Sequence, residues 1–244
     1  MKLNKVLFLL TAMTMFIACK EEEGTYPGND TEPAVSVFQL KAEGEGENPD
    51  CDAKIRIATN NQVTDVYYMV EKEETKAANL EKMGETGYMD YVIEKGQKVD
   101  NISASQASDV LIKEAYGKNM ITIVGVGKGK KVANEIPFFG IKWNPIGIGT
   151  FDFPALGVVG VQSKFDVRDD TEWYRMLNRF MADSYFIFQL EGDEVLMDKQ
   201  TLQPGLEMSG KGYIDRDTKI IHLNSTFYQG GDAIPGGESL IYLP

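Results

Sequence analysis

The sequence is poor in the residues from which metal centres and disulfide frameworks are built. It contains one histidine, His222, and two cysteines, Cys19 and Cys51, among 244 residues, too few for a His-rich or Cys-rich metal cluster or a network of disulfides. Basic residues are also scarce, because 25 Lys and Arg stand against 37 Asp and Glu, which gives a net charge of −12. A protein that binds nucleic acid presents a basic face to the phosphates, so this balance argues against a nucleic-acid partner. We therefore expect no metal site, no cofactor and no nucleic-acid partner.

The apolar run at the N-terminus is too short to span a membrane. Residues 6–17 are twelve uncharged residues that follow Lys2 and Lys5, whereas a membrane-spanning helix needs about 20 apolar residues. A basic start followed by a short apolar run is typical of an export signal, so we exclude residues 1–18 from the folded protein. The whole chain is 43% apolar and 25% charged, which is typical of a folded globular protein.

The end of this segment indicates how it is processed. Ordinary signal peptidase needs a small residue three positions before the cut, and cleavage after Ala18 would put the bulky Phe16 there. Residues 16–19, Phe-Ile-Ala-Cys, instead resemble the lipobox of bacterial lipoproteins. This resemblance implies that Cys19 is acylated, that it becomes the first residue of the mature chain, and that its acyl chains hold the protein on a membrane. The alternative is an uncleaved signal anchor.

The next residues carry a cluster of charges. Lys20, Glu21, Glu22 and Glu23 resemble the surface-export signal of lipoproteins from Bacteroides-type bacteria. That resemblance implies a protein anchored in the outer membrane and exposed on the cell surface. Residues 19–33 would form a tether rich in turn-forming residues. As a flexible coil, it would span about 20 Å.

Residues 34–142 have the pattern of a first β-rich domain. Residues 35–40 and 53–57 alternate in polarity, and residues 120–126 form an apolar, β-branched run that is typical of a central strand. The segment that follows, residues 125–131 with the sequence Gly-Val-Gly-Lys-Gly-Lys-Lys, looks like a phosphate-binding loop. It lacks the Ser or Thr and the helix that such a loop needs, so a β-hairpin is the better prediction.

Helical spacing interrupts this pattern in the middle of the domain. Residues 75–83 and 87–95 predict two short helices, each ended by a glycine, and residues 108–116 predict a third. The order of strands resembles the fibronectin-III and immunoglobulin-like modules of many Bacteroides lipoproteins. The remaining cysteine, Cys51, is expected to be a small apolar residue of the core.

Residues 143–244 predict about eight strands, which favours a second sandwich or a small closed barrel. Alternation is clear at Phe186, Phe188 and Leu190, which should point inward. The segment resembles the C-terminal β modules of uncharacterised Bacteroides lipoproteins, a family without an assigned active site. The residues that carry this resemblance are Trp143, Gly147, Gly149, Thr150, Phe151, Tyr174, Arg175 and Asn178.

No pattern in the sequence selects catalytic residues. His222 is predicted on an outward face, and no nucleophile lies in a recognisable turn. A glycoside hydrolase needs only two carboxylates, but the pairs Asp169–Asp170 and Asp215–Asp217 occur at predicted turns, where aspartate is favoured for backbone reasons. A hydrolase is therefore kept only as an alternative.

Outward aromatic residues give a candidate binding surface. Tyr185 and Tyr228 are predicted on polar faces, and Trp173 is added as a third candidate. The orientations of Trp143 and Trp173 stay open, because the alternative is that both are anchors of the core. Such rings could stack on a sugar while the amides of Gln189 and Asn224 bind its hydroxyls. The prediction is a non-enzymatic binding or adhesion lipoprotein, with a glycan as its ligand. A structural subunit of a surface complex, which docks a protein partner, is the alternative.

Overall fold

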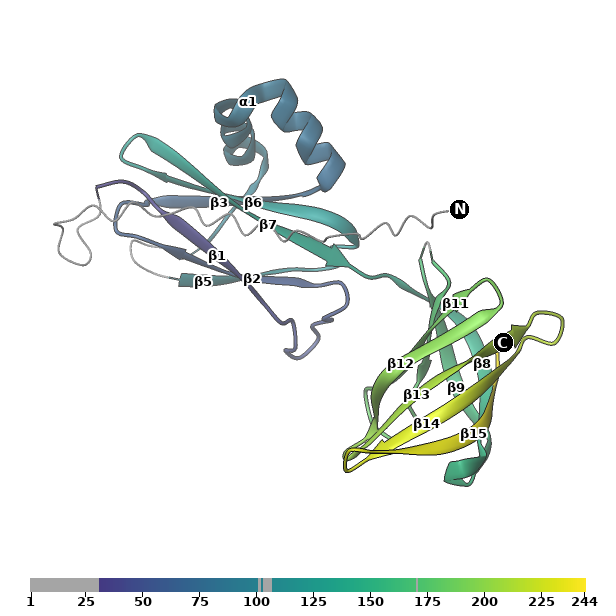
Figure 1. Ribbon diagram of the computed structural model, residues 1–244. Helices are drawn as coiled ribbons and strands as arrows, with labels where there is room; N and C mark the ends of the chain where they lie inside the picture. The colour runs from purple at the N-terminus through teal and green to yellow at the C-terminus, as the bar shows by residue number, and fades with distance from the viewer. Residues whose placement is uncertain (1–30, 101, 103–106, 170) are drawn as a thin grey trace, which may run out of the picture.

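The structure is a computed structural model that describes residues 31–100, 102, 107–169 and 171–244. It is mainly β, as predicted, and it includes a closed barrel of eight strands (Figure 1). The proposed lipidation site, Cys19, and the proposed export signal at residues 20–23 lie outside the described residues.

The first seven strands form two sheets that enclose one apolar core. Isoleucines at alternate positions of the central strands, such as Ile55, Ile57, Ile121 and Ile123, are fully buried between the sheets. The first sheet has the order β1 (Val35–Leu40), β2 (Ala53–Thr59), β5 (Ala107–Ile112). The second has the order β4 (Gln97–Lys98), β3 (Asp65–Lys72), β6 (Gly117–Gly127), β7 (Lys130–Gly140).

Two sequence features of this region are confirmed. Strands β6 and β7 pair in an antiparallel hairpin whose last register pair is Gly127 with Lys130, so the glycine-rich segment is a turn between strands. Cys51 is buried beside Asp52, whose carboxylate oxygen lies 3.8 Å from its Sγ atom. The segment that resembles a phosphate-binding loop therefore opens no helix.

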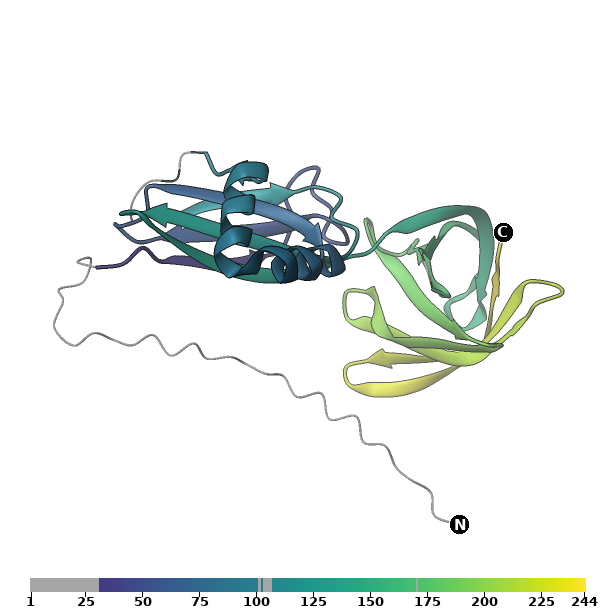
Figure 2. The ribbon, with the colours of Figure 1, turned by 90° about the horizontal axis from the view of Figure 1, so that it is seen from above.

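The helical insert covers the outer face of the second sheet (Figure 2). Helix α1 (Glu73–Lys95) is broken at Gly84, where φ is 67° and ψ is 171°, so it consists of two short helices as predicted. A left-handed φ is accessible to glycine without steric cost, which explains why the break falls there. The second half buries Tyr88 and Val92 against Val124 of β6.

The third predicted helix, residues 108–116, is wrong. Residues Ala107–Ile112 form β5, which pairs with β2 so that Val110 lies opposite Ile55. Ser108, Val110 and Ile112 occupy alternate positions, and this period of two fits a strand. Pairing with a buried neighbouring strand outweighs a weak local helical preference.

The remaining strands close into an up-and-down barrel, which decides between the two architectures that the sequence left open. Each strand pairs antiparallel with the next, and β15 closes on β8 through three register pairs from Leu240 with Asp152 to Tyr242 with Thr150. The strands are β8 (Trp143–Phe153), β9 (Val158–Arg168), β10 (Trp173–Leu177), β11 (Tyr185–Glu191), β12 (Glu194–Gln203), β13 (Leu206–Asp215), β14 (Ile220–Gln229) and β15 (Asp232–Tyr242). A short 3₁₀ helix, Pro154–Leu156, joins β8 to β9.

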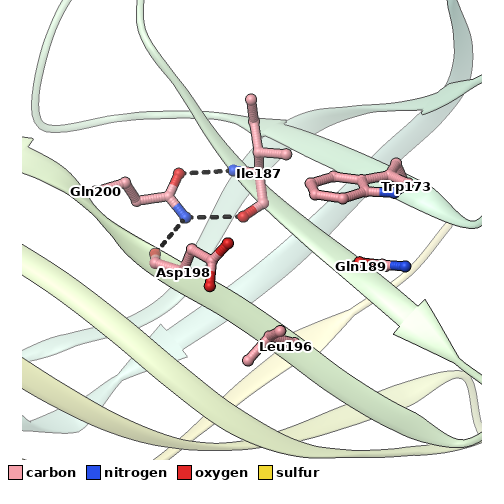
Figure 3. Close-up of a pocket in the computed structure, with 6 residues that line it drawn as sticks. All are labelled: Trp173, Ile187, Gln189, Leu196, Asp198 and Gln200. Carbon is pink, nitrogen blue, oxygen red and sulfur yellow. Dashed lines mark hydrogen bonds between the residues drawn. The ribbon is translucent and has the colours of Figure 1, made fainter. Parts of the chain in front are cut away.

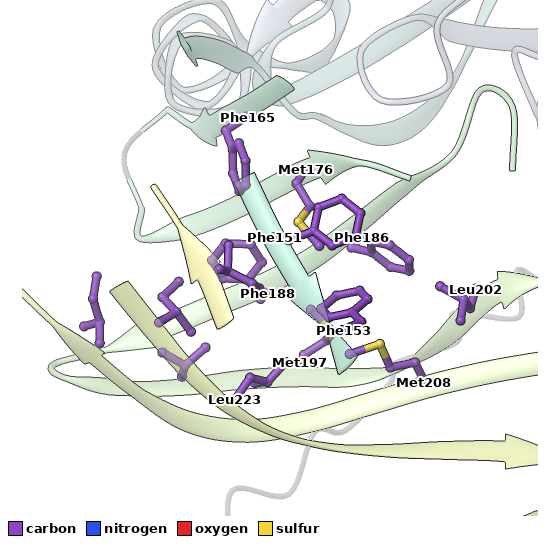
Figure 4. Close-up of a cluster of buried hydrophobic side chains, with 14 of the residues drawn as sticks. Phe151, Phe153, Phe165, Met176, Phe186, Phe188, Met197, Leu202, Met208 and Leu223 are labelled. Carbon is purple, nitrogen blue, oxygen red and sulfur yellow. The ribbon is translucent and has the colours of Figure 1, made fainter. Parts of the chain in front are cut away.

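Aromatic side chains fill the interior of the barrel (Figure 4). The ring of Phe153 lies 4.7 Å from that of Phe151 and 6.1 Å from that of Phe186, measured between centroids. Phe186, Phe188 and Leu190 point inward, which confirms the alternation read from the sequence. The barrel therefore encloses a packed core of side chains rather than an open channel.

The seam between β8 and β15 depends on a close backbone approach at Gly149. A Cβ atom at this position would lie 2.1 Å from the carbonyl oxygen of Tyr242 and 2.8 Å from the ring of Phe165. We expect Gly149→Ala to lower the free energy of unfolding by about 1–3 kcal/mol, since the strands must move apart to accept the methyl group. Urea denaturation measures this loss.

The neighbouring residue provides a matched control. Ile148 has 63% of its surface exposed. Truncating an exposed side chain changes stability by about 0.5 kcal/mol or less, so Ile148→Ala should be nearly neutral. Equal losses for the two variants would mean that the seam does not depend on the small residue.

Candidate functional site

A hollow of about 220 Å³ lies on the outer wall of the barrel, over β10, β11 and β12 (Figure 3). Its lining residues point outward because they alternate with residues of the barrel core, such as Phe186, Phe188 and Val195. The lining combines one aromatic ring, two aliphatic side chains and three polar side chains: Trp173, Ile187, Gln189, Leu196, Asp198 and Gln200.

An irregularity in β12 creates this hollow. Regular pairing between β11 and β12 covers only three register pairs, from Gln189 with Leu196 to Glu191 with Glu194. Further along, β12 shifts its register with β13 between Met197 and Gln200. Such a bulge bends a strand away from its neighbour, which leaves space on the wall between β11 and β12.

The side chain of Gln200 replaces the missing backbone pairing. Its Oε1 atom accepts a hydrogen bond of 2.8 Å from the backbone N–H of Ile187, and its Nε2 atom donates one of 2.7 Å to the carbonyl of the same residue (Figure 3). Nε2 also donates to the carbonyl of Asp198 at 3.2 Å. The amide of Gln200 is thus used to hold the strands, and its role at the site is structural.

Three other side chains of the hollow have polar groups available. Trp173 lies directly opposite Gln189 in the β10–β11 register, so their side chains emerge side by side. The side chains of Trp173, Gln189 and Asp198 make no hydrogen bond or ion pair with another described residue. An indole face flanked by an unpaired amide and an unpaired carboxylate can stack on an apolar ring face and bind hydroxyl groups at its rim.

Tyr185 lies on the same strand face as Gln189, but its ring is occupied. The guanidinium carbon of Arg175 lies 4.1 Å from the centroid of Tyr185 and 4.7 Å from that of Trp143. Arg175 also forms ion pairs with Asp166 at 2.7 Å and with Asp50 at 2.8 Å. The two tryptophans therefore differ: Trp143 is packed in this cluster, and Trp173 lines the hollow.

Asn224 and Tyr228 lie on β14, which is separated from β11 by β12 and β13. Asn224 is exposed. The hydroxyl of Tyr228 lies 3.0 Å from that of Ser209, and Lys199 Nζ lies 4.5 Å from the centroid of its ring. The hollow therefore brings together only Trp173 and Gln189 of the five candidate ligand-binding residues.

Four lining residues were not foreseen from the sequence: Ile187, Leu196, Asp198 and Gln200. A signal for two of them was present. Alternation with Phe186 and Phe188 puts Ile187 outward, and the tight turn at Gly192 and Asp193 brings Leu196 opposite Gln189. Nothing in the sequence pattern indicates the bulge that positions Asp198 and Gln200.

Of the acidic pairs considered for hydrolysis, Asp215 and Asp169 accept hydrogen bonds near turns. The hydroxyl of Thr218, together with the backbone N–H groups of Thr218 and Asp217, holds the pKa of Asp215 below its usual value. Asp169 accepts a hydrogen bond of 2.9 Å from Asn144, and Asp170 lies outside the described residues. Asp215 is therefore ionised at neutral pH. Glycoside hydrolysis requires a general acid that carries a proton, so Asp215 is poorly suited to that role.

Within the described ranges, no cluster of three or more His, Cys, Asp or Glu side chains is arranged to hold a metal ion. The same part of the chain has no helix with the length and apolar character needed to cross a membrane. Comparisons with protein-family models, with curated proteins and with solved structures found no match for this chain.

Proposed function

We propose that the chain is a non-enzymatic binding protein of the outer cell surface that binds carbohydrate through the hollow on the barrel wall. The observation that carries this proposal is the half-buried ring of Trp173 beside the polar groups of Gln189 and Asp198, which pair with no other described residue. Ligand sites combine apolar or aromatic walls with a few polar groups that orient the ligand. A sugar matches such a site because its ring has an apolar face and a hydroxylated rim.

Replacing Trp173 with alanine tests the proposal directly. We expect Trp173→Ala to weaken binding about tenfold or more, because the stacking surface is lost. The probes are neutral gluco-, xylo- and manno-oligosaccharides, screened on an array and then measured by isothermal titration calorimetry. Phe38→Ala is the matched control, since Phe38 is an exposed aromatic residue on β1, outside the barrel.

Two results would contradict carbohydrate binding at this hollow. One is the absence of binding to every probe by the unaltered protein. The other is unchanged affinity in Trp173→Ala, with both variants unfolding at the same urea concentration as the parent. If Phe38→Ala loses as much affinity as Trp173→Ala, the binding site would not be the hollow beside Trp173.

We also propose that residues 34–142 are an immunoglobulin-like or fibronectin-III-like spacer. The strand order supports this: the first, second and fifth strands form one sheet, and the third, sixth and seventh lie in the other. Immunoglobulin-type sandwiches divide their strands in the same way, except that the fourth strand lies in the first sheet. The helical insert between β3 and β4 is an addition to that plan.

Attachment of a lipid at Cys19 and surface display remain part of the proposal, and cell experiments test them. Labelled fatty acid should be incorporated into the protein, and Cys19→Ser should release it from the membrane fraction. Protease treatment of whole cells should remove it if the acidic segment at residues 20–23 directs it outward. A protein without label, or a Cys19→Ser variant that stays with the membrane, would overturn the anchor.

A structural subunit of a surface complex is the second candidate. Two aliphatic side chains on the outer wall favour it, because Ile148 on β8 and Val159 on β9 are both strongly exposed. Apolar side chains of this kind lose their contact with water when a protein partner docks on them. Crosslinking in intact cells that recovers one stoichiometric partner, without any bound glycan, would support this function instead.

A further inference from the structure

The hollow belongs to a longer row of outward side chains that crosses five strands of the barrel. Successive register pairs join one residue from each of β10 to β14, so these residues lie side by side along the wall. The row consists of Trp173, Gln189, Leu196, Lys211 and Asn224. With neighbouring strands about 4.8 Å apart, it extends over about 19 Å.

A second hollow continues the first along this row. It has a volume of about 380 Å³ and lies over β11, β12 and β13, next to the turn that joins β11 and β12. The two hollows share Gln189 and Leu196 in their linings, and Lys211 lies on the far side of the second. The two hollows therefore adjoin, and together they are called the groove, which runs from Trp173 to Lys211 with Asn224 beyond it.

Polar groups are available along the whole groove. The side chains of Gln189, Lys211 and Asn224 form no hydrogen bond or ion pair with other described residues. The row thus offers an aromatic face at one end and unpaired amide and ammonium groups at intervals of one or more strands. A single sugar ring could contact only one of these regions.

The charges around the groove favour a neutral ligand. Three carboxylates, those of Glu191, Glu194 and Asp198, line the two hollows, and Lys211 is the only cation among the lining residues. Uronic acids and sulfated sugars would be repelled by this excess of negative charge. Hydroxyl groups can donate hydrogen bonds to carboxylates without such a cost.

We infer that the groove binds a linear, neutral oligosaccharide of several rings, with one ring on Trp173 and a later ring beside Lys211 and Asn224. This inference rests on the proposed carbohydrate-binding function and adds the length and the charge of the ligand. Leu196, which is exposed between the two ends of the groove, provides the apolar contact for the rings in the middle.

Calorimetric titration with ladders of oligosaccharides, that is, series of increasing length from one to six sugar rings, tests the inference. The probes are the same neutral gluco-, xylo- and manno-oligosaccharides, with oligogalacturonates as the charged comparison. Affinity for a neutral ladder should rise with each added ring until the groove is filled and then become constant. The oligogalacturonates should bind at least about tenfold more weakly than the neutral ladder of equal length.

Two variants locate the far end of the groove. Lys211→Ala and Asn224→Ala should each weaken binding of the longest probes about threefold to tenfold and leave binding of the shortest unchanged. Trp173→Ala should weaken binding of all of them. Lys164→Ala, which removes an exposed lysine of β9 outside the groove, is the matched control and should have no effect.

The outcomes distinguish the two proposals. If one ring binds as tightly as six, or if Asn224→Ala and Lys211→Ala leave the affinity for long probes unchanged, the extended groove is wrong and the site at Trp173 stands. Tighter binding of oligogalacturonates than of neutral oligosaccharides of equal length would contradict the inference that the ligand is neutral. If the unaltered protein binds none of the neutral ladders, both the groove and the proposed function fail.

Discussion

Replacing Phe153 with alanine is expected to lower the free energy of unfolding of the barrel by about 3–5 kcal/mol. Phe153 is completely buried and packs against the rings of Phe151 and Phe186. Its removal deletes an aromatic side chain and leaves a cavity among rigid neighbours. The strands that surround it cannot collapse into that space without disturbing the ladder of the closed barrel.

Tryptophan fluorescence during urea denaturation measures this loss selectively. The chain has two tryptophans, Trp143 and Trp173, and both lie on strands of the barrel. The signal therefore reports on the barrel even if the two regions of the chain unfold in separate steps. Phe38→Ala is the control, because Phe38 is 55% exposed and lies on β1, in the sandwich that the two sheets of β1 to β7 form outside the barrel. Equal transitions for the two variants would contradict the packed interior.

Replacing Arg175 with methionine should destabilise the barrel by about 1–3 kcal/mol. The guanidinium group lies between the rings of Tyr185 and Trp143 and pairs with Asp166 and Asp50. Its side chain is only 16% exposed. Methionine preserves the aliphatic stem but leaves the largely buried carboxylate of Asp166 without its partner. The fluorescence of Trp143 should change as well, because its ring loses a stacked cation.

Two control variants separate the contributions at this cluster. Arg216 pairs with Glu172 and Asp193 on the surface, so Arg216→Met should have a much smaller effect. Asp50→Asn removes only the ion pair between β10 and the segment before β2, and it should cost less than Arg175→Met. If Asp50→Asn is as harmful as Arg175→Met, the pair with Asp166 contributes nothing.

Local patterns in the sequence predicted much of the fold. Alternation predicted the strands and the inward positions of Phe186 and Phe188, and glycines predicted the break in the helical insert at Gly84. Closure of the barrel could not be predicted. It depends on pairing between β8 and β15, which are separated by about 90 residues and carry no local signal for each other. The segment at residues 108–116 was misassigned because its partner strand lies more than 50 residues away.

The candidate site was predicted less completely than the fold. Polarity indicated that Gln189 and Asn224 point outward, but it left the orientation of Trp173 open and could not tell which strands are neighbours around the barrel. Tyr185 illustrates the limit, since its ring is covered by Arg175 from the adjacent strand. The hollow itself arises from the bulge in β12 and from Gln200, and both depend on the course of the backbone rather than on residue type.

The closed ladder of the barrel has a consequence for self-association. A closed barrel has no free strand edge, so another chain cannot extend it by β-augmentation. The sandwich does have edges, at β1, β5, β4 and β7. Two lysines and a proline within β7, Lys130, Lys131 and Pro137, are the kind of residues that block edge-to-edge aggregation. Because β4 has only two residues, β1 and β5 are the described edges at which another chain could pair most readily.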